Sequence, residues 1–169
     1  MKNCILIVLI FYSIFISCSR NKIINENLIS AEEMINTDIV KAQQLLDSIN
    51  PEIISDRFNQ SYYFLLLAEA DYKNNVLSLN NDSLLEISIQ YYRKHDNKIL
   101  EGRALLNKGR VWNKANMEEE ALKYYLQALD VLGSTKEYSL LTKLYDDLGN
   151  IYLNQGLYKD ALHMYKLWS

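Results

Sequence analysis

Apolar residues recur at helical spacing along almost the whole chain from about residue 27 onward. Short polar clusters, such as Asn36-Thr37-Asp38 and Asn74-Asn75, interrupt this pattern. Asn, Asp and Ser at such points can cap the free N–H groups of a following helix, and Pro51 suits a first helical position. The pattern predicts about eight helices, with the rough spans 27–36, 38–49, 55–74, 82–95, 98–115, 118–132, 137–154 and 158–167.

The composition supports an all-α fold. The 169 residues include five glycines and one proline, well below the roughly 7% and 5% of ordinary proteins. A β-sandwich needs a turn every ~8–12 residues, and a dinucleotide-binding fold needs glycines after its strands. Both architectures therefore fit this chain poorly. At 49% hydrophobic and 23% charged residues, the chain is also too apolar to be disordered.

The helices come in pairs that repeat. Segment 105–125 aligns with segment 145–165 at one constant offset. An earlier copy places Ala68, Ser88 and Tyr92 at corresponding positions, with a longer connection between its two helices. The aligned pairs are Gly109 with Gly149, Trp112 with Tyr152, Ala121 with Ala161, and Tyr125 with Tyr165.

This pattern resembles the tetratricopeptide repeat, which has a basic period of about 34 residues. The resemblance covers residues 55–168 well and 27–49 only by the rhythm of its helices; Lys108 departs from it. It implies a right-handed superhelical stack of antiparallel helix pairs, at about 27–49, 55–95, 98–132 and 137–168. It assigns repeat packing to Gly109, Trp112, Ala121, Tyr125, Leu148, Gly149, Tyr152, Ala161 and Tyr165.

The physical basis of that packing is steric. We expect Gly109 and Gly149 to lie where one helix approaches the backbone of its partner, with Ala121 and Ala161 allowing the reciprocal approach. The aromatic residues would then fill the spaces between neighbouring helices, and each tyrosine hydroxyl could stay at a wet edge.

The amino terminus predicts export. After Met-Lys-Asn comes an unbroken apolar run from Cys4 to Ser17, followed by Arg20 and Lys22. A membrane-spanning helix needs ~20 apolar residues, whereas the core of a signal peptide needs about 7–15, which this run matches. We therefore interpret residues 1–17 as a signal peptide and residues 18–26 as a polar tether.

The end of this run, Phe15-Ile16-Ser17-Cys18, resembles a bacterial lipobox, although Phe15 stands where Leu is usual. The resemblance implies that Cys18 is acylated and anchors the protein to a membrane of the cell envelope. The alternatives are a plain secretory peptide or an uncleaved anchor. No acidic run follows Cys18, unlike in the surface-exported lipoproteins of Bacteroidetes, so the resemblance implies the periplasmic face of the outer membrane over the cell surface.

Little in the sequence points to enzyme chemistry. The 18 basic and 21 acidic residues are scattered, unlike a nucleic-acid interface, and no nucleotide, hydride-transfer or hydrolase motif occurs. Cys4 and Cys18 build no disulfide framework, and His95 and His163 lack partners at metal-ligand spacing. The run Glu118 to Glu120 fits the start of a helix. We expect no cofactor, metal or enzymatic activity.

The family resemblance instead implies a concave groove lined by the first helix of each repeat. Arginine and asparagine donors there could hold the carboxylate or backbone of an extended peptide. The alternative for any one of these residues is a solvated helix face. The groove positions are Arg103, Leu106, Arg110, Asn113, Lys114, Lys143, Asp146, Asn150 and Asn154.

Together these features predict a lipid-anchored scaffold that binds a protein or peptide, similar to the tetratricopeptide lipoproteins and membrane-bound regulators of Bacteroidetes. The sensory part of such a regulator is the main alternative, and a glycan-binding lipoprotein is a third. The last helix leaves Leu162, Tyr165 and Trp168 without a following helix to pack on. We therefore expect either a truncated array or self-association through this edge.

Overall fold

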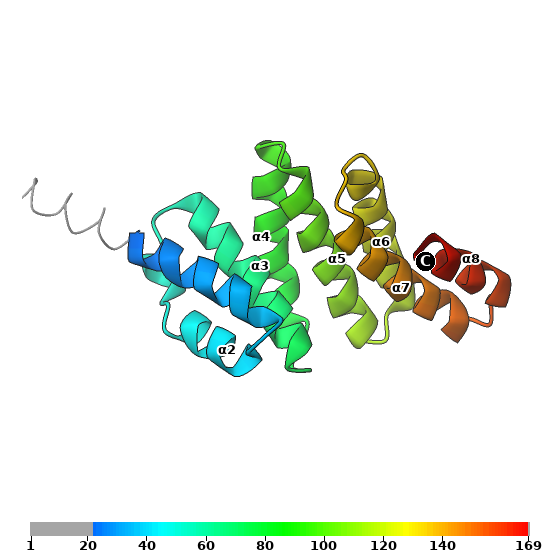
Figure 1. The fold of residues 1–169 in the computed structure, drawn as a ribbon, viewed down its shortest axis with the longest axis horizontal. Coiled ribbons are helices and arrows are strands. Elements are labelled where there is room, and N and C mark those ends of the chain that lie inside the picture. The colour runs from blue at the N-terminus through cyan, green and yellow to red at the C-terminus, as the bar shows by residue number, and fades with distance from the viewer. Residues whose placement is uncertain (1–21, 169) are drawn as a thin grey trace, which may run out of the picture.

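The computed structural model describes residues 22–168, and every regular element in them is helical. Figure 1 shows the helices following one another along the long axis, from helix 22–35 at one end to α8 at the other. The all-α prediction is confirmed. The remaining elements are α2 (Ile39–Asp47), the 3-10 turn η1 (Pro51–Ile53), α3 (Arg57–Lys73), α4 (Asn80–Lys94), α5 (Lys98–Lys114), α6 (Glu118–Gly133), α7 (Tyr138–Asn154) and α8 (Tyr158–Trp168).

Helices α2 to α8 begin and end within two residues of the predicted spans. The first helix differs, because residues 22–26 are helical where a polar tether was expected. The physical reason is packing: Ile24 and Leu28 are buried in the core and hold this segment against it. The predicted signal peptide, Cys18 and the rest of the tether, residues 18–21, lie outside the described residues. No helix among the described residues combines the length and apolar character required to cross a bilayer.

Side chains cap the starts of α2, α3 and α5; of these caps, only Asp38 lies in one of the polar clusters that predicted them. The clusters before α4 and α6 supply no side-chain cap. Asp38 accepts a hydrogen bond from the backbone N–H of Lys41 at 3.2 Å, and Asp56 accepts one from Asn59 at 2.8 Å. Asn97 does the same for Leu100 at 3.2 Å. These caps satisfy N–H groups that the first turn of a helix leaves free.

Four helices end in the same way. Two residues after the last residue of α3, α4, α5 and α7, the backbone takes a left-handed conformation, with φ between 52° and 73°. The next residue then donates its N–H to a carbonyl five positions back, for example from Met117 to Trp112 at 3.0 Å. This is the Schellman arrangement, which pairs carbonyls that a helix end leaves free. The left-handed residues are Asn75, Asp96, Asn116 and Gly156.

Consecutive helices from α2 to α8 pack against one another, and α5 also contacts α3 and α7. Helices α3, α5 and α7 therefore form one row, while α4, α6 and α8 pack beside it (Figure 1). The core runs along the array between the two rows, and its largest fully buried side chains include Tyr92, Leu105 and Tyr125.

The glycines of the repeat make contacts with side chains. A Cβ atom on Gly109 would lie 2.3 Å from the ring of Tyr125, and one on Gly149 would lie 2.7 Å from the ring of Tyr165. The expected close approach to partner backbone is therefore wrong: a tyrosine ring from the second helix of the pair fills the space. Ala121 and Ala161 are buried, Leu148 is fully buried, and Trp112 and Tyr152 are half-buried.

The tyrosine hydroxyls also differ from expectation. Tyr125 is fully buried, and its hydroxyl has no hydrogen-bond partner among the described residues. The ring must cover Gly109 at the centre of the pair, which carries the hydroxyl away from solvent. Tyr165 lies at the outer end, where its hydroxyl donates to Asn150 at 2.9 Å. Leu162, near the same end, is exposed.

Lys108, the departure from the family pattern, is buried by an ion-pair network. Its ammonium lies 2.7 Å from Glu86 and 3.3 Å from Asp82, both on α4. The indole N–H of Trp112 donates to the same Asp82 carboxylate at 2.8 Å. A buried lysine is tolerated here because its charge is paired.

Candidate functional site

Helices α3, α5 and α7, together with the carboxyl-terminal half of helix 22–35, enclose a cleft of about 270 Å³. Its walls combine charged side chains with apolar ones such as Ile35, Ile99 and Leu140. The row of alternate helices creates this cleft, and α4, α6 and α8 contribute none of its lining residues.

Four of the nine expected groove residues line the cleft: Arg103, Leu106, Arg110 and Lys143. The other five do not. They lie on α5 and α7, mostly toward the carboxyl ends of these helices, and most of them contact neighbouring elements. Lys114 donates to Asn75, Asn150 accepts from Tyr165, and Asn154 lies 3.5 Å from Glu118. Asn113 and Asp146 also lie outside the cleft.

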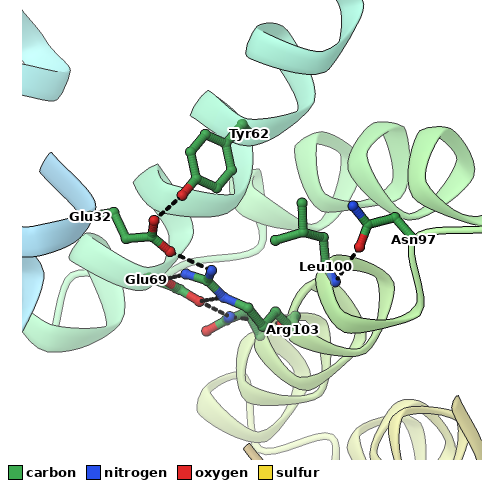
Figure 2. A network of polar contacts seen from close by, with 7 residues as sticks. Glu32, Tyr62, Glu69, Asn97, Leu100 and Arg103 are labelled. Carbon is green, nitrogen blue, oxygen red and sulfur yellow. Dashed lines mark hydrogen bonds and ion pairs between the residues drawn. The ribbon is translucent and has the colours of Figure 1, made fainter. Parts of the chain in front are cut away.

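Arg103 is the centre of a network that joins three helices (Figure 2). Its Nε and Nη2 donate to the two carboxylate oxygens of Glu69 on α3, at 3.1 and 2.7 Å. Its Nη1 donates to Glu32 on helix 22–35 at 2.6 Å. This two-pronged pairing with Glu69 fixes the plane of the guanidinium.

Further hydrogen bonds complete this network. Glu32 also accepts from the hydroxyl of Tyr62 on α3, and the amide of Asn107 donates to Glu69 at 3.2 Å. Burial opposes ionisation of Glu32, but the hydrogen bonds from Tyr62 and Arg103 and the charge of Arg103 hold its pKa below the ordinary value. Burial and the bond to Glu32 raise the pKa of Tyr62.

Arg110 is held in a second ion pair. Its Nε donates to Asp147 on α7 at 2.7 Å, and its guanidinium lies 4.1 Å from the centre of the Tyr72 ring on α3. Both charged side chains of the pair are largely buried. Burial raises the pKa of Asp147 against the opposing effect of Arg110. Neither arginine is therefore the free donor that the sequence suggested.

Two lysines of the cleft have a different environment. Lys73, at the end of α3, and Lys143, on α7, form no ion pair or hydrogen bond with any described residue. Partial burial lowers the pKa of Lys143; Glu69 opposes this effect, and the charges of Arg110, Lys73 and Arg103 add to it. Ser139 lies one helical turn before Lys143 and also lines the cleft.

Sequence reasoning missed Glu69, Tyr72 and Lys73. The repeat itself carried the signal, because Ala68 in the earliest copy corresponds to Gly109 in the next. In that same alignment Arg110 corresponds to Glu69, Asn113 to Tyr72 and Lys114 to Lys73. Glu69 and Tyr72 of the earliest copy therefore contact Arg103 and Arg110 of the next copy.

The cleft suits the binding of a polar or charged ligand. None of its lining residues is His or Cys, so Ser139 has no imidazole there to act as a base. Within residues 22–168, no three His, Cys, Asp or Glu side chains gather as metal ligands would. His95 stacks on Tyr91, with 4.1 Å between ring centres, and lies at the surface.

The acidic run Glu118 to Glu120 forms the first turn of α6, as expected. The Glu118 carboxylate also faces the end of α7, where the side-chain amides of Asn154 and Gln155 lie 3.5 and 3.3 Å away. It therefore contributes to packing between α6 and α7.

No family model matches this chain, and no curated protein or solved structure matches it either. The internal repetition of the fold is what supports a repeat architecture. The Gly109–Tyr125 and Gly149–Tyr165 contacts recur at the same spacing, and four helix ends share one turn geometry.

Proposed function

We propose that this protein is a non-enzymatic scaffold of the tetratricopeptide type, which binds a protein or peptide partner in the cleft formed by α3, α5 and α7. The observation that carries the proposal is the cleft itself, whose charged walls are held in place by Arg103 and Arg110 in ion pairs across helices. Fixed polar groups beside apolar walls suit recognition of a peptide segment.

The architecture that we propose is a right-handed superhelical stack of antiparallel helix pairs. Its support is the recurring contact between a glycine on the first helix and a tyrosine ring on the second. Contacts between alternate helices, α3 with α5 and α5 with α7, support a continuous inner row. In such an array each unit buries its apolar face against its neighbours, which leaves the inner row available for partners.

A photo-crosslinking experiment tests the proposed cleft. A photoreactive phenylalanine derivative replaces Ser139 at the rim, in cells that produce the full chain, and the same group replaces Lys94 on α4 as the control. We expect one protein to be crosslinked from position 139 and not from position 94. The purified partner should then bind the wild-type chain. Equal crosslinking from both positions, or none from position 139, would contradict the proposal.

Ser139 is a better position for this test than Arg110 or Asn150. Removing Arg110 would leave the buried Asp147 carboxylate unpaired, and removing Asn150 would take away the partner of Tyr165. Lost binding in such variants could reflect lost stability. Ser139 is exposed and accepts substitution more readily.

We further propose that the protein is anchored in a bacterial envelope through a lipid on Cys18, on the periplasmic face of the outer membrane. The support is the apolar run that ends in Phe15-Ile16-Ser17-Cys18. Mass spectrometry of the membrane fraction tests this. We expect an acylated chain that begins at Cys18, which Cys18→Ala abolishes and Cys4→Ala preserves. A mature chain that begins at Ser19 or later would refute the anchor.

A further inference from the structure

We propose that Lys73 and Lys143 form an anion-binding subsite of the cleft, which takes an acidic side chain of the protein partner. This inference rests on the proposed scaffold function and specifies the chemistry of its ligand. The subsite lies between the end of α3 and the first two turns of α7.

The two arginines of the cleft already form ion pairs with carboxylates of the chain. Arg103 directs its Nε, Nη1 and Nη2 to the carboxylates of Glu32 and Glu69. Arg110 gives its Nε to Asp147 and lies against the ring of Tyr72. Arg110 is largely buried, and its charge is already paired with Asp147. An incoming acid at Arg103 would have to displace a carboxylate that is itself partly or largely buried. Leaving that carboxylate unpaired would cost more than the new contact returns.

The two lysines of the cleft differ from the arginines in having no such partner among the described residues. Lys73 and Lys143 line the same cleft from two different helices, and neither is paired within the described part of the chain. Two ammonium groups can together donate several hydrogen bonds to one carboxylate.

The surrounding charges support an anion. Burial is the main cause of the lowered pKa of Lys143; the carboxylate of Glu69 opposes it, and repulsion by the positive charges of Arg110, Lys73 and Arg103 adds to it. A bound carboxylate would relieve the repulsion. Glu137 is the one unpaired carboxylate among the residues that line the cleft, so the unpaired groups there still sum to a positive charge.

The cleft also offers apolar contacts to a ligand that binds the two lysines. Leu106 and Leu140, with Ile35 and Ile99, supply apolar surface in the same cleft. A ligand with a carboxylate next to apolar side chains would contact both kinds of wall. A segment of the partner in which Glu or Asp lies between apolar residues meets this requirement, whereas an inorganic anion uses only the polar part.

The test compares two peptides by fluorescence anisotropy, using the full chain in a non-ionic detergent. The acidic probe is Ala-Leu-Glu-Leu-Ala-amide with an uncharged fluorophore on its amino-terminal nitrogen, and the neutral probe has Gln in place of Glu. We expect the acidic peptide to bind at least about tenfold more tightly, as loss of a charged hydrogen bond at one site implies. Lys73→Gln and Lys143→Gln should each remove most of that preference. Lys94→Gln makes the same change of charge on α4, outside the cleft, and should leave it intact.

A footprint locates the bound peptide. Acetylation of lysines, followed by mass spectrometry, should show protection of Lys73 and Lys143 by the acidic peptide, with Lys94 unchanged. Equal binding of the two peptides within the cleft would overturn the anion subsite and leave the scaffold in place. Protection by inorganic phosphate but by neither peptide would overturn the acidic side chain as the source of the anion. If none of the three probes binds or protects the lysines, the subsite is overturned. The crosslinking experiment then remains an independent test of the scaffold function.

Discussion

The ring of Tyr125 occupies the space that a side chain on Gly109 would need. A Cβ atom at that glycine would lie 2.3 Å from two atoms of the ring. Because Tyr125 is fully buried, the ring has no solvent-filled space into which it can move. The pairing of α5 with α6 therefore depends on the absence of one methyl group.

We predict that Gly109→Ala destabilises the protein by about 1–3 kcal/mol, because overpacking of the core outweighs the gain in helix propensity. Urea unfolding followed by circular dichroism would measure the change. Gly133→Ala is the matched control, since nothing lies within 4 Å of the added Cβ atom. It should leave stability unchanged or raise it slightly. A Gly109→Ala variant as stable as the control would disprove the packing role.

The turn after α7 provides a second prediction. Gly156 has a φ of 73° and open space around it, so an added side chain would meet backbone strain and no steric contact. We expect Gly156→Ala to lower the free energy of unfolding by about 1 kcal/mol, the usual cost of a left-handed conformation. Gly156→Asn should recover part of the loss, because Asn75 and Asn116 adopt the same conformation in the equivalent turns. Equal stability of the Ala and Gly forms would speak against a fixed left-handed turn.

The network around Arg103 gives a third prediction. Arg103→Met would leave Glu32 and Glu69 without their cation, and we expect a loss of about 3 kcal/mol in unfolding free energy. Lys41→Met removes an exposed ion pair with Asp38 and should cost less than about 1 kcal/mol. Thermal and urea unfolding of the two variants would compare these losses. Similar small losses in both would show that the Arg103 network contributes no more than a surface pair.

A fourth prediction concerns pH. The pKa of Glu32 is lowered in the folded protein from an ordinary value of 4.5. Below that value the unfolded chain binds the proton more readily, so the contribution of Glu32 to stability falls as pH drops through its folded pKa. Glu32→Gln should weaken the loss of stability below about pH 4.5. Glu33→Gln, at the exposed neighbouring residue, should not. Parallel pH profiles for both variants and the wild type would refute this role.

The sequence predicted the helices well because their signals are local. Apolar spacing and polar clusters such as the one that ends at Asp38 define where helices lie, and both act within a few residues. The start of the first helix was missed, because only the burial of Ile24 in the folded array shows that residues 22–26 belong to it. The repeat also identified Gly109 and Gly149 as special positions and Tyr125 and Tyr165 as packing residues, although it did not predict that these rings cover the two glycines.

The cleft was predicted less completely for the opposite reason. Its helices were correct, but the partners of Arg103 lie 34 and 71 residues away in the sequence. Periodicity gives no information about such pairs, because they depend on how successive helices stack. The sequence therefore predicts Arg103 as a free donor, whereas the structure pairs it with Glu32 and Glu69. The family resemblance places groove positions only on the two later copies of the repeat, so it does not include Lys73 of the earliest copy.

The Arg103 network also affects how the array comes apart. In a linear stack each helix depends mainly on its neighbours, so unfolding can begin at either end. Glu32 ties helix 22–35 to α5 as well as to α3, and detaching that end requires breaking an ion pair with a helix well inside the array. Among the described helices α8 packs chiefly on α7. Fraying should therefore begin at α8, and backbone amides of α8 should exchange with deuterium before those of the helix that bears Glu32.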